Sequence, residues 1–334
     1  MAASIYPFPD GPVPVGPGLS PPVARLVREL TGVVPPGPAD LSVSRRRYVE
    51  SRQALAPATP DLALVRDEEI AGPGGPLRLR HYRAHPGWRP VPALLFLHGG
   101  GWTVGDLDSH DALCRQLAAA TGHAIVSVDY RLAPEHPFPA ALDDAWAALL
   151  WLQANAAALA IDPLAIGVAG DSAGGNLAAV LALRARDRGQ PRLKAQVLIY
   201  PCVDLVAFHP SHRARAEGYL LTRDLYLSYV ANYLGQGTSP LGWEVSPLRA
   251  ADFAGLAPAV IVTAGFDPLL DEGKAYAGRL AEAGVPVIHR SYADMVHGFI
   301  TMGGRLEAAN QAVTDIAKAL DSLDLYGLRD GAGI

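Results

Sequence analysis

The chain has 334 residues and a formal net charge of −5; half of its residues are hydrophobic and 18% are charged. That apolar share excludes an intrinsically disordered chain, and the lack of a glycine at every third position excludes a collagen-like one. The mildly acidic balance, 28 Lys and Arg against 33 Asp and Glu, argues against a general nucleic-acid-binding protein.

The N-terminal region is rich in proline, with ten of the 29 prolines among the first 40 residues. We expect no regular structure over residues 1–20, because proline and glycine interrupt both helices and strands. Helices are predicted at Pro22–Leu30, where Pro22 suits a first turn and Gly32 follows the end, and at Leu41–Leu55.

A β-hairpin is predicted to follow. Two β-rich runs, Leu62–Ile70 and Leu77–Tyr82, flank the turn sequence Gly72-Pro73-Gly74-Gly75-Pro76. Glycine and proline at this density favour a chain reversal, so we expect the two strands to pair antiparallel.

From Ala93 onward, short apolar runs alternate with longer stretches of helical pattern. Near-continuous apolar strands separated by helices are typical of a parallel sheet covered on both faces, which predicts an α/β fold. The predicted strands are Ala93–Leu97, Ala124–Val128, Ala165–Ala169, Ala195–Tyr200, Ala259–Thr263 and Val287–His289, and the predicted helices are Asp111–Ala120, Ala140–Ala154, Gly174–Asp187 and Asp271–Ala283.

One interval breaks this alternation. About 58 residues lie between Tyr200 and Ala259, which is too many for one crossover connection. We therefore predict an insertion over roughly residues 204–250, with one helix at Thr222–Leu234.

The most informative motif is Gly170-Asp171-Ser172-Ala173-Gly174-Gly175, between a predicted strand and a predicted helix. A G-x-S-x-G sequence in this context is typical of the nucleophile elbow of α/β-hydrolases. The strained turn raises the serine above the sheet, and side chains at the glycines would collide with the neighbouring strand or helix. Ser172 is therefore the predicted nucleophile.

A second motif, His98-Gly99-Gly100-Gly101-Trp102, follows the predicted strand Ala93–Leu97. Three consecutive glycines let backbone N–H groups approach a ligand closely, and at the end of a strand they could face a developing oxyanion. Such a loop acts together with the N–H of the residue after the nucleophile, which is Ala173 here.

A serine hydroxyl needs a general base to become a good nucleophile. In α/β-hydrolases the order along the chain is nucleophile, acid, histidine, which leaves His209, His212, His289 and His297 as candidates. Only His297 is predicted in a loop after the final strand, so we predict that it is the base. Histidines before the elbow, such as His110, have no evident partner.

The acid should lie between Ser172 and His297 at the end of a strand. Asp267 closely follows the apolar run Ala259–Thr263 and meets this condition. Asp271 is the chief rival, but it opens a predicted helix, where a carboxylate favourably meets the helix dipole. Asp267 is therefore the predicted acid.

Other polar features are predicted to be structural. Cys114 and Cys202 are too few and too distant in sequence for a disulfide framework and are expected as buried thiols. Arg131 and Glu135 flank a proline turn and are expected to form a buried ion pair that braces the glycine loop. The pair His209-x-x-His212 has no evident third ligand, so no metal site is predicted.

These motifs together resemble the hormone-sensitive-lipase family of α/β-hydrolases, in its bacterial esterase branch. The resemblance covers roughly residues 60–320. It rests on His98–Trp102, Asp129-Tyr130-Arg131-Leu132-Ala133-Pro134-Glu135, Gly170–Gly175, Asp267-Pro268-Leu269 and His297-Gly298-Phe299, which fall in the family's order.

The resemblance implies an α/β-hydrolase fold, with a mostly parallel eight-stranded sheet flanked by helices and a helical cap. It implies oxyanion donors at Gly100 and Gly101. Residues 61–203 and 251–325 would form the catalytic core, and residues 1–60 and 204–250 would form the two cap segments. Candidate pocket-lining side chains are Phe8, Trp102, Phe208, Tyr219 and Leu221.

The predicted function is hydrolysis of short to medium acyl carboxylic esters through an acyl-enzyme intermediate, by a Ser172–His297–Asp267 triad without metal or cofactor. The alternatives are an amidase or deacetylase with the same triad, and a non-catalytic small-molecule receptor. We see no signal peptide or membrane helix, so a cytoplasmic protein is expected, with a small-molecule ester as its partner and neither membrane nor nucleic acid. An edge strand near Val287–Tyr292 could support a homodimer.

Overall fold

The computed structural model describes residues 16–31, 41–87, 89–206 and 209–327. Its centre is an eight-stranded sheet with the order β1-β2-β4-β3-β5-β6-β7-β8. The strands are β1 (Leu64–Gly72), β2 (Gly75–Arg83), β3 (Val91–Leu97), β4 (Ala124–Val128), β5 (Ile161–Asp171), β6 (Gln196–Ile199), β7 (Ala259–Phe266) and β8 (Val287–Val296).

Six strands run parallel, and β1 and β2 form the predicted antiparallel hairpin, with β2 also antiparallel to β4. The strands β3 and β4 at the centre of the sheet are almost entirely apolar, because both faces of the sheet are covered there. In β3, Leu95 and Leu97 belong to one hydrophobic cluster while Leu94 and Phe96 belong to the other. The predicted α/β-hydrolase fold with a mostly parallel eight-stranded sheet is therefore confirmed.

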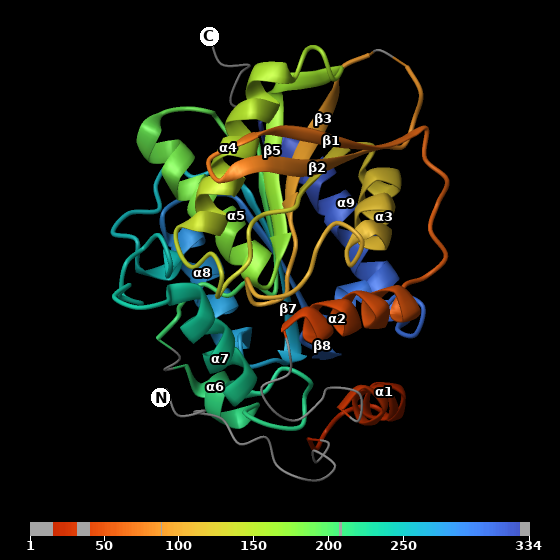
Figure 1. The fold of residues 1–334 in the computed structure, drawn as a ribbon, viewed down its shortest axis with the longest axis vertical. Helices are drawn as coiled ribbons and strands as arrows, with labels where there is room; N and C mark the ends of the chain where they lie inside the picture. The colour runs from red at the N-terminus through yellow and green to blue at the C-terminus, as the bar shows by residue number, and fades with distance from the viewer. Residues whose placement is uncertain (1–15, 32–40, 88, 207–208, 328–334) are drawn as a thin grey trace.

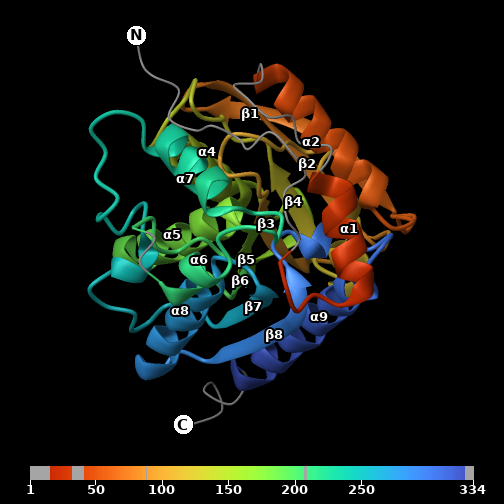
Figure 2. The ribbon, with the colours of Figure 1, turned by 90° about the horizontal axis from the view of Figure 1, so that it is seen from below.

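Helices cover both faces of the sheet (Figures 1 and 2). One face packs against α4 (Ala140–Asn155), α5 (Ala173–Arg188) and α8 (Leu270–Glu282), and the other against α3 (Asp111–Thr121) and α9 (Glu307–Gly327). Helix α9 was not predicted from the sequence, and β8 continues seven residues beyond the predicted strand Val287–His289. None of the helices in the described ranges combines the length and the apolar character needed to cross a bilayer.

Four helices gather at the lower end of the molecule in Figure 1: α1 (Pro21–Thr31), α2 (Leu41–Leu55), α6 (Pro210–Ala214) and α7 (Arg223–Leu234). Seen from below in Figure 2, α1 and α2 lie to one side of the strand ends and α6 and α7 to the other. These helices come from the two predicted cap segments. The division of the chain into a core and a cap stays a prediction.

Candidate active site

A sharp turn between β5 and α5 carries Ser172. The residue has φ 55° and ψ −117°, which a residue with a side chain rarely adopts. A hydrogen bond from Ser172 N to Ile199 O (2.9 Å) and one from Cys202 N to Ser172 O (3.2 Å) hold the turn. Ser172 is the residue that caps α5, so the positive end of the helix dipole faces charge that develops there.

Three glycines make room for this turn. A Cβ at Gly170 would overlap the backbone of Gly174, and a Cβ at Gly174 would overlap the carbonyl of Leu97. A Cβ at Gly175 would lie 2.9 Å from the Cβ of Pro201. These contacts confirm the steric reason for glycine at each position of the motif.

The structure brings His297 and Asp267 to Ser172. His297 directly follows β8, and its Nε2 lies 2.8 Å from Ser172 Oγ. Its Nδ1 lies 2.7 Å from Oδ2 of Asp267, which follows β7 and is fully buried. The other carboxylate oxygen accepts a hydrogen bond from Leu269 N at 2.8 Å. With Nδ1–H donated to the carboxylate, Nε2 can accept the serine proton.

The rival residues have other partners. His289 Nε2 lies 2.9 Å from Thr263 Oγ1, within the sheet. His209 pairs with Asp204 inside the inserted segment (3.2 Å). The other two rivals connect that segment to α8: His212 pairs with Glu272 (2.7 Å), and Asp271 accepts a hydrogen bond from Ser211 N (2.8 Å).

The glycine loop His98–Trp102 lies beside the serine. Gly100 and Gly101 have φ of 121° and 59°, and a Cβ at Gly100 would overlap the carbonyl of Val104. The N–H groups of Gly100 and Gly101 donate no hydrogen bond to any described residue. The N–H of Ala173 is in the first turn of α5, where a helix offers no acceptor. All three are thus available to an oxyanion.

Asp171 connects the elbow to this loop, a role that the sequence analysis missed. Its Oδ1 accepts a hydrogen bond from Gly99 N at 2.7 Å and lies 3.1 Å from His110 Nε2. Burial alone would raise the pKa of Asp171, but the charge of His110 and these hydrogen bonds outweigh burial and lower it. Its position directly before the nucleophile was the one available signal; nothing in the sequence pointed to His110.

The expected brace of the glycine loop is made by other residues. Arg131 pairs with Asp144 at 2.8 Å, so the predicted ion pair between Arg131 and Glu135 is wrong. Glu135 instead pairs with Arg45 of α2 at 2.6 Å, and Arg45 Nε also donates to Thr103 O at 2.9 Å. Packing decides the exchange: α4 brings Asp144 to Arg131, and α2 brings Arg45 to Glu135 in its turn.

A pocket of about 370 Å³ opens above Ser172 and His297. Its walls come from the glycine loop and from α2 and α7, which contribute Tyr48 and Tyr229. Of the candidate lining side chains, Trp102 and Leu221 line the pocket, whereas Tyr219 stacks on Phe266 with ring centroids 5.3 Å apart. Phe8 and Phe208 lie outside the described residues.

Cys114 and Cys202 are both buried and free, as predicted. In the described part of the chain, no group of three or more His, Cys, Asp or Glu side chains could hold a metal ion.

Comparison with known proteins shows the family. A model of the α/β hydrolase fold matches residues 94–301. The chain is 43% identical to a carboxylic ester hydrolase, LipN, of Mycobacterium tuberculosis over 260 residues, 75% of this chain and 69% of that protein. It is 38% identical to an ethyl acetate hydrolase of Pseudomonas putida over 295 residues, 86% of this chain and 92% of that protein.

Among solved structures, a hyperthermophilic esterase from the archaeon Pyrobaculum calidifontis matches with a TM-score of 0.84 at 40% identity. The match covers 92% of this chain and 99% of that chain.

Proposed function

The chain belongs to the α/β-hydrolases, in the hormone-sensitive-lipase family, and from that premise we propose that it is a serine carboxylesterase for short to medium acyl esters. The observation that carries the proposal is the continuous contact Ser172–His297–Asp267 beside three available N–H groups. Hydroxyl, imidazole and carboxylate in this order are the components of acyl transfer.

The proposed reaction begins when Ser172 Oγ attacks the ester carbonyl carbon. His297 Nε2 takes the serine proton, and Asp267 holds the imidazole in the tautomer that permits this. The N–H groups of Gly100, Gly101 and Ala173 stabilise the negative charge on the carbonyl oxygen. His297 then returns the proton to the leaving alcohol, and water hydrolyses the acyl-enzyme by the same route.

The pocket supports the proposed chain length. Its volume of about 370 Å³ is at the lower end of the range of small-molecule sites, roughly 300–1,000 Å³. A Cβ at Gly101 would overlap the ring of Tyr229, so α7 lies directly against the glycine loop and limits the space above it. We also propose that residues 1–60 and 204–250 act as the cap that sets this limit.

The experiment that tests the function is ester turnover by Ser172→Ala, with p-nitrophenyl esters from acetate upward as substrates. We expect turnover to fall to background, and an organophosphonate to label wild-type Ser172 but not the variant. Ser228→Ala is the matched control, because Ser228 lines the same pocket but takes no part in the hydrogen bonds that join Ser172, His297 and Asp267. Near-wild-type turnover by Ser172→Ala would contradict the assignment of Ser172 as the nucleophile.

The same assay separates the alternatives. An amidase with this triad would hydrolyse a matched amide as well as the ester, an esterase would hydrolyse only the ester, and a receptor would bind without turnover or labelling. The cytoplasmic location and a homodimer formed through the edge strand β8 stay predictions.

A further inference from the structure

Helix α2 presents a polar face to the catalytic pocket. The pocket is lined by Ser44, Arg47, Tyr48, Ser51 and Arg52, whose spacing places them along one side of the helix. Most of the pocket wall is apolar, as expected for a site that receives the carbon chain of an ester. The face of α2 differs, because two of its five side chains are cationic.

The two arginines of the pocket are not neutralised by carboxylates of the same pocket. Asp171 is its only carboxylate among the described residues. That carboxylate is 3% exposed and already interacts with Gly99 N, His110 and, at 3.3 Å, Tyr200 OH. The pocket is therefore cationic in a chain whose formal net charge is −5.

Arg52 is the deeper of the two arginines. Its Nη1 donates to Thr301 Oγ1 at 3.0 Å, and its guanidinium carbon lies 4.8 Å from the centroid of the Tyr48 ring. Its Nε is buried and has no hydrogen-bond partner. Among the residues that the structure describes, no carboxylate lies within ion-pair distance of Arg52. Burial would lower the pKa of Arg52, but the neighbouring Tyr48, Tyr200 and Asp171 outweigh burial and raise it. The guanidinium therefore keeps its charge and an unused N–H donor without a directly paired carboxylate.

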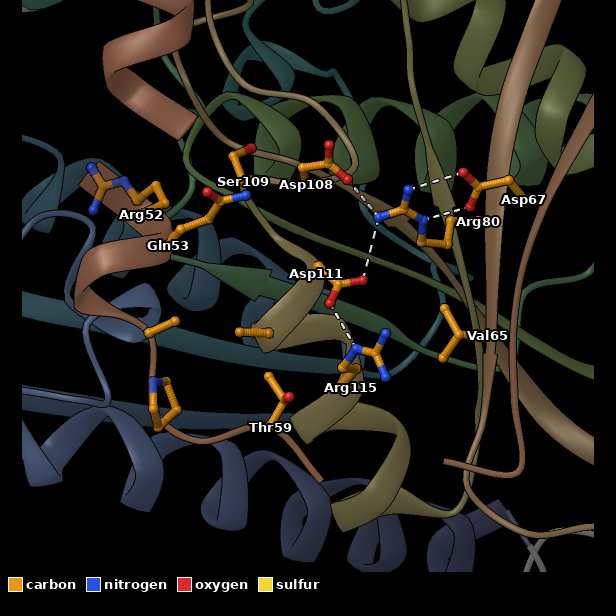
Figure 3. A pocket seen from close by; sticks show the side chains of 13 residues that line it. Arg52, Gln53, Thr59, Val65, Asp67, Arg80, Asp108, Ser109, Asp111 and Arg115 are labelled. Carbon is orange, nitrogen blue, oxygen red and sulfur yellow. Dashed lines mark hydrogen bonds and ion pairs between the residues drawn. The ribbon is translucent and has the colours of Figure 1, made fainter. Parts of the chain in front are cut away.

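A second pocket, of about 620 Å³, lies on the other side of Arg52, which lines both pockets (Figure 3). The carboxylates of this second pocket already form ion pairs with other arginines. There Arg80 pairs with Asp67, Asp108 and Asp111, and Arg115 pairs with Asp111. Arg52 points away from this cluster and joins none of its ion pairs (Figure 3). Its hydrogen bond is made on the catalytic side instead.

The head of Arg52 also lies close to the catalytic base. Both of its Nη atoms lie 3.5 Å from the position that a Cβ on Gly298 would occupy, and Gly298 directly follows His297. A group bound to this guanidinium would therefore share the pocket with the ester that Ser172 attacks.

We propose that Arg52 binds a carboxylate carried by the substrate, so that the preferred esters bear one negative charge besides the ester group. A planar guanidinium matches a carboxylate in a two-pronged hydrogen bond, and the exposed Arg47 at the rim adds attraction for the approaching anion. Esters of this class include half-esters of dicarboxylic acids and esters of hydroxy acids. The inference rests on the proposed ester hydrolysis and specifies which esters the enzyme prefers.

The test compares charged and neutral esters in matched pairs. Monoethyl adipate with ethyl heptanoate places the charge on the acyl side, and 4-acetoxybenzoate with 4-tolyl acetate places it on the alcohol side. For each pair, kcat/KM(charged)/kcat/KM(neutral) is measured in the wild type, Arg52→Gln, Arg52→Lys and Arg46→Gln. Arg46 is the matched control, because it is an exposed arginine of the same helix that does not line the pocket.

We expect this ratio to fall at least about tenfold in Arg52→Gln for one of the two pairs, a change of about 1.4 kcal/mol. Arg52→Lys should restore part of the ratio, and Arg46→Gln should leave it unchanged. A merely structural role, holding Tyr48 and Thr301, would change the two esters of a pair equally. An unchanged ratio in Arg52→Gln for both pairs overturns the inference while leaving ester hydrolysis intact.

A measurement on the wild type needs no variant. Raising the sodium chloride concentration should lower kcat/KM for the preferred charged ester and leave that of its neutral partner nearly constant, because salt screens the attraction. Equal salt responses in both pairs overturn the inference. Failure of the wild type to hydrolyse any neutral ester, with Ser172 unlabelled by organophosphonate, would instead overturn the proposed function on which it rests.

Discussion

The carboxylate of Asp171 accepts a hydrogen bond from the backbone N–H of Gly99 at 2.7 Å. The two residues are 72 positions apart in the chain, but β3 and β5 pair in parallel with Leu97 opposite Gly170, so Gly99 and Asp171 lie just beyond the same end of the strand pair. One side chain therefore links the turn that carries Ser172 to the loop that carries the proposed oxyanion donors.

Removing this link should impair the chemical step. In Asp171→Ala, Gly99 N loses its acceptor and His110 loses its ion-pair partner, so Gly100 and Gly101 lose part of their fixed position. We expect kcat to fall about 10- to 10³-fold. The upper limit is the effect of losing one oxyanion donor completely. Steady-state kinetics on p-nitrophenyl butyrate measures the effect.

Asp129→Ala is the control for this variant, because Asp129 pairs with Arg78 at the surface at 2.6 Å. We expect its kcat to stay near the wild-type value. If Asp171→Ala matched this control, the hydrogen bond would not position the loop.

Asp267→Asn should reduce activity without unfolding the protein. The amide can still accept the hydrogen bond from Leu269 N, but it can present an N–H to His297 Nδ1 and so favour the unproductive tautomer. We expect kcat/KM to fall about 10³- to 10⁴-fold. Asp271→Asn tests the rival acid and should keep most of the activity; the reverse ranking of the two variants would contradict the assignment.

The buried pair of Glu272 and His212 should stabilise the attachment of the inserted segment to the core. Glu272 also accepts hydrogen bonds from Val203 N (2.6 Å) and Asp204 N (3.2 Å). Glu272→Ala leaves all three groups buried without an acceptor, so we expect the free energy of unfolding to fall by about 3 kcal/mol. Urea unfolding measures this change.

Glu282→Ala, at the exposed end of the same helix, should change the free energy of unfolding by less than about 0.5 kcal/mol. Equal effects of the two substitutions would show that the buried pair contributes nothing particular.

Stability should decrease in mild acid through His81. Burial lowers the pKa of this histidine from 6.5 to about 4, although Glu68 at 3.3 Å acts in the opposite direction. Below pH 6.5 the unfolded chain binds a proton that the folded protein does not. The free energy of unfolding is therefore unaffected by this group above pH 6.5. It falls by roughly 3 kcal/mol as the pH decreases from 6.5 to 4.

In His81→Phe the ring contact with Trp151 can persist while the titrating group is gone. We expect the loss of unfolding free energy between pH 6.5 and 4 to shrink by roughly 3 kcal/mol, measured by urea unfolding across that range. His85→Gln, at an exposed position, should retain the wild-type pH dependence. An unaltered pH dependence in His81→Phe would show that another group causes the acid sensitivity.

The sequence by itself determined the architecture and the order of the proposed catalytic residues. The spacing of apolar residues along the chain differs between strands and helices, because it follows from the local backbone geometry of each. Apolar runs such as Ala124–Val128 could therefore be predicted at their observed bounds. Ser172 and His297 lie at junctions where such elements end. The parallel topology carries those junctions to one edge of the sheet, which makes their meeting predictable without coordinates.

Only the tertiary structure decided which charged side chains meet. Arg131 pairs with Asp144 rather than Glu135, and Asp171 pairs with a backbone N–H and with His110. The cationic wall around Arg52 depends on which face α2 turns toward Ser172. Such pairings depend on how separate helices and strands pack against one another. A long polar side chain can reach several partners with similar energies, so residue spacing along the chain does not determine which pair forms.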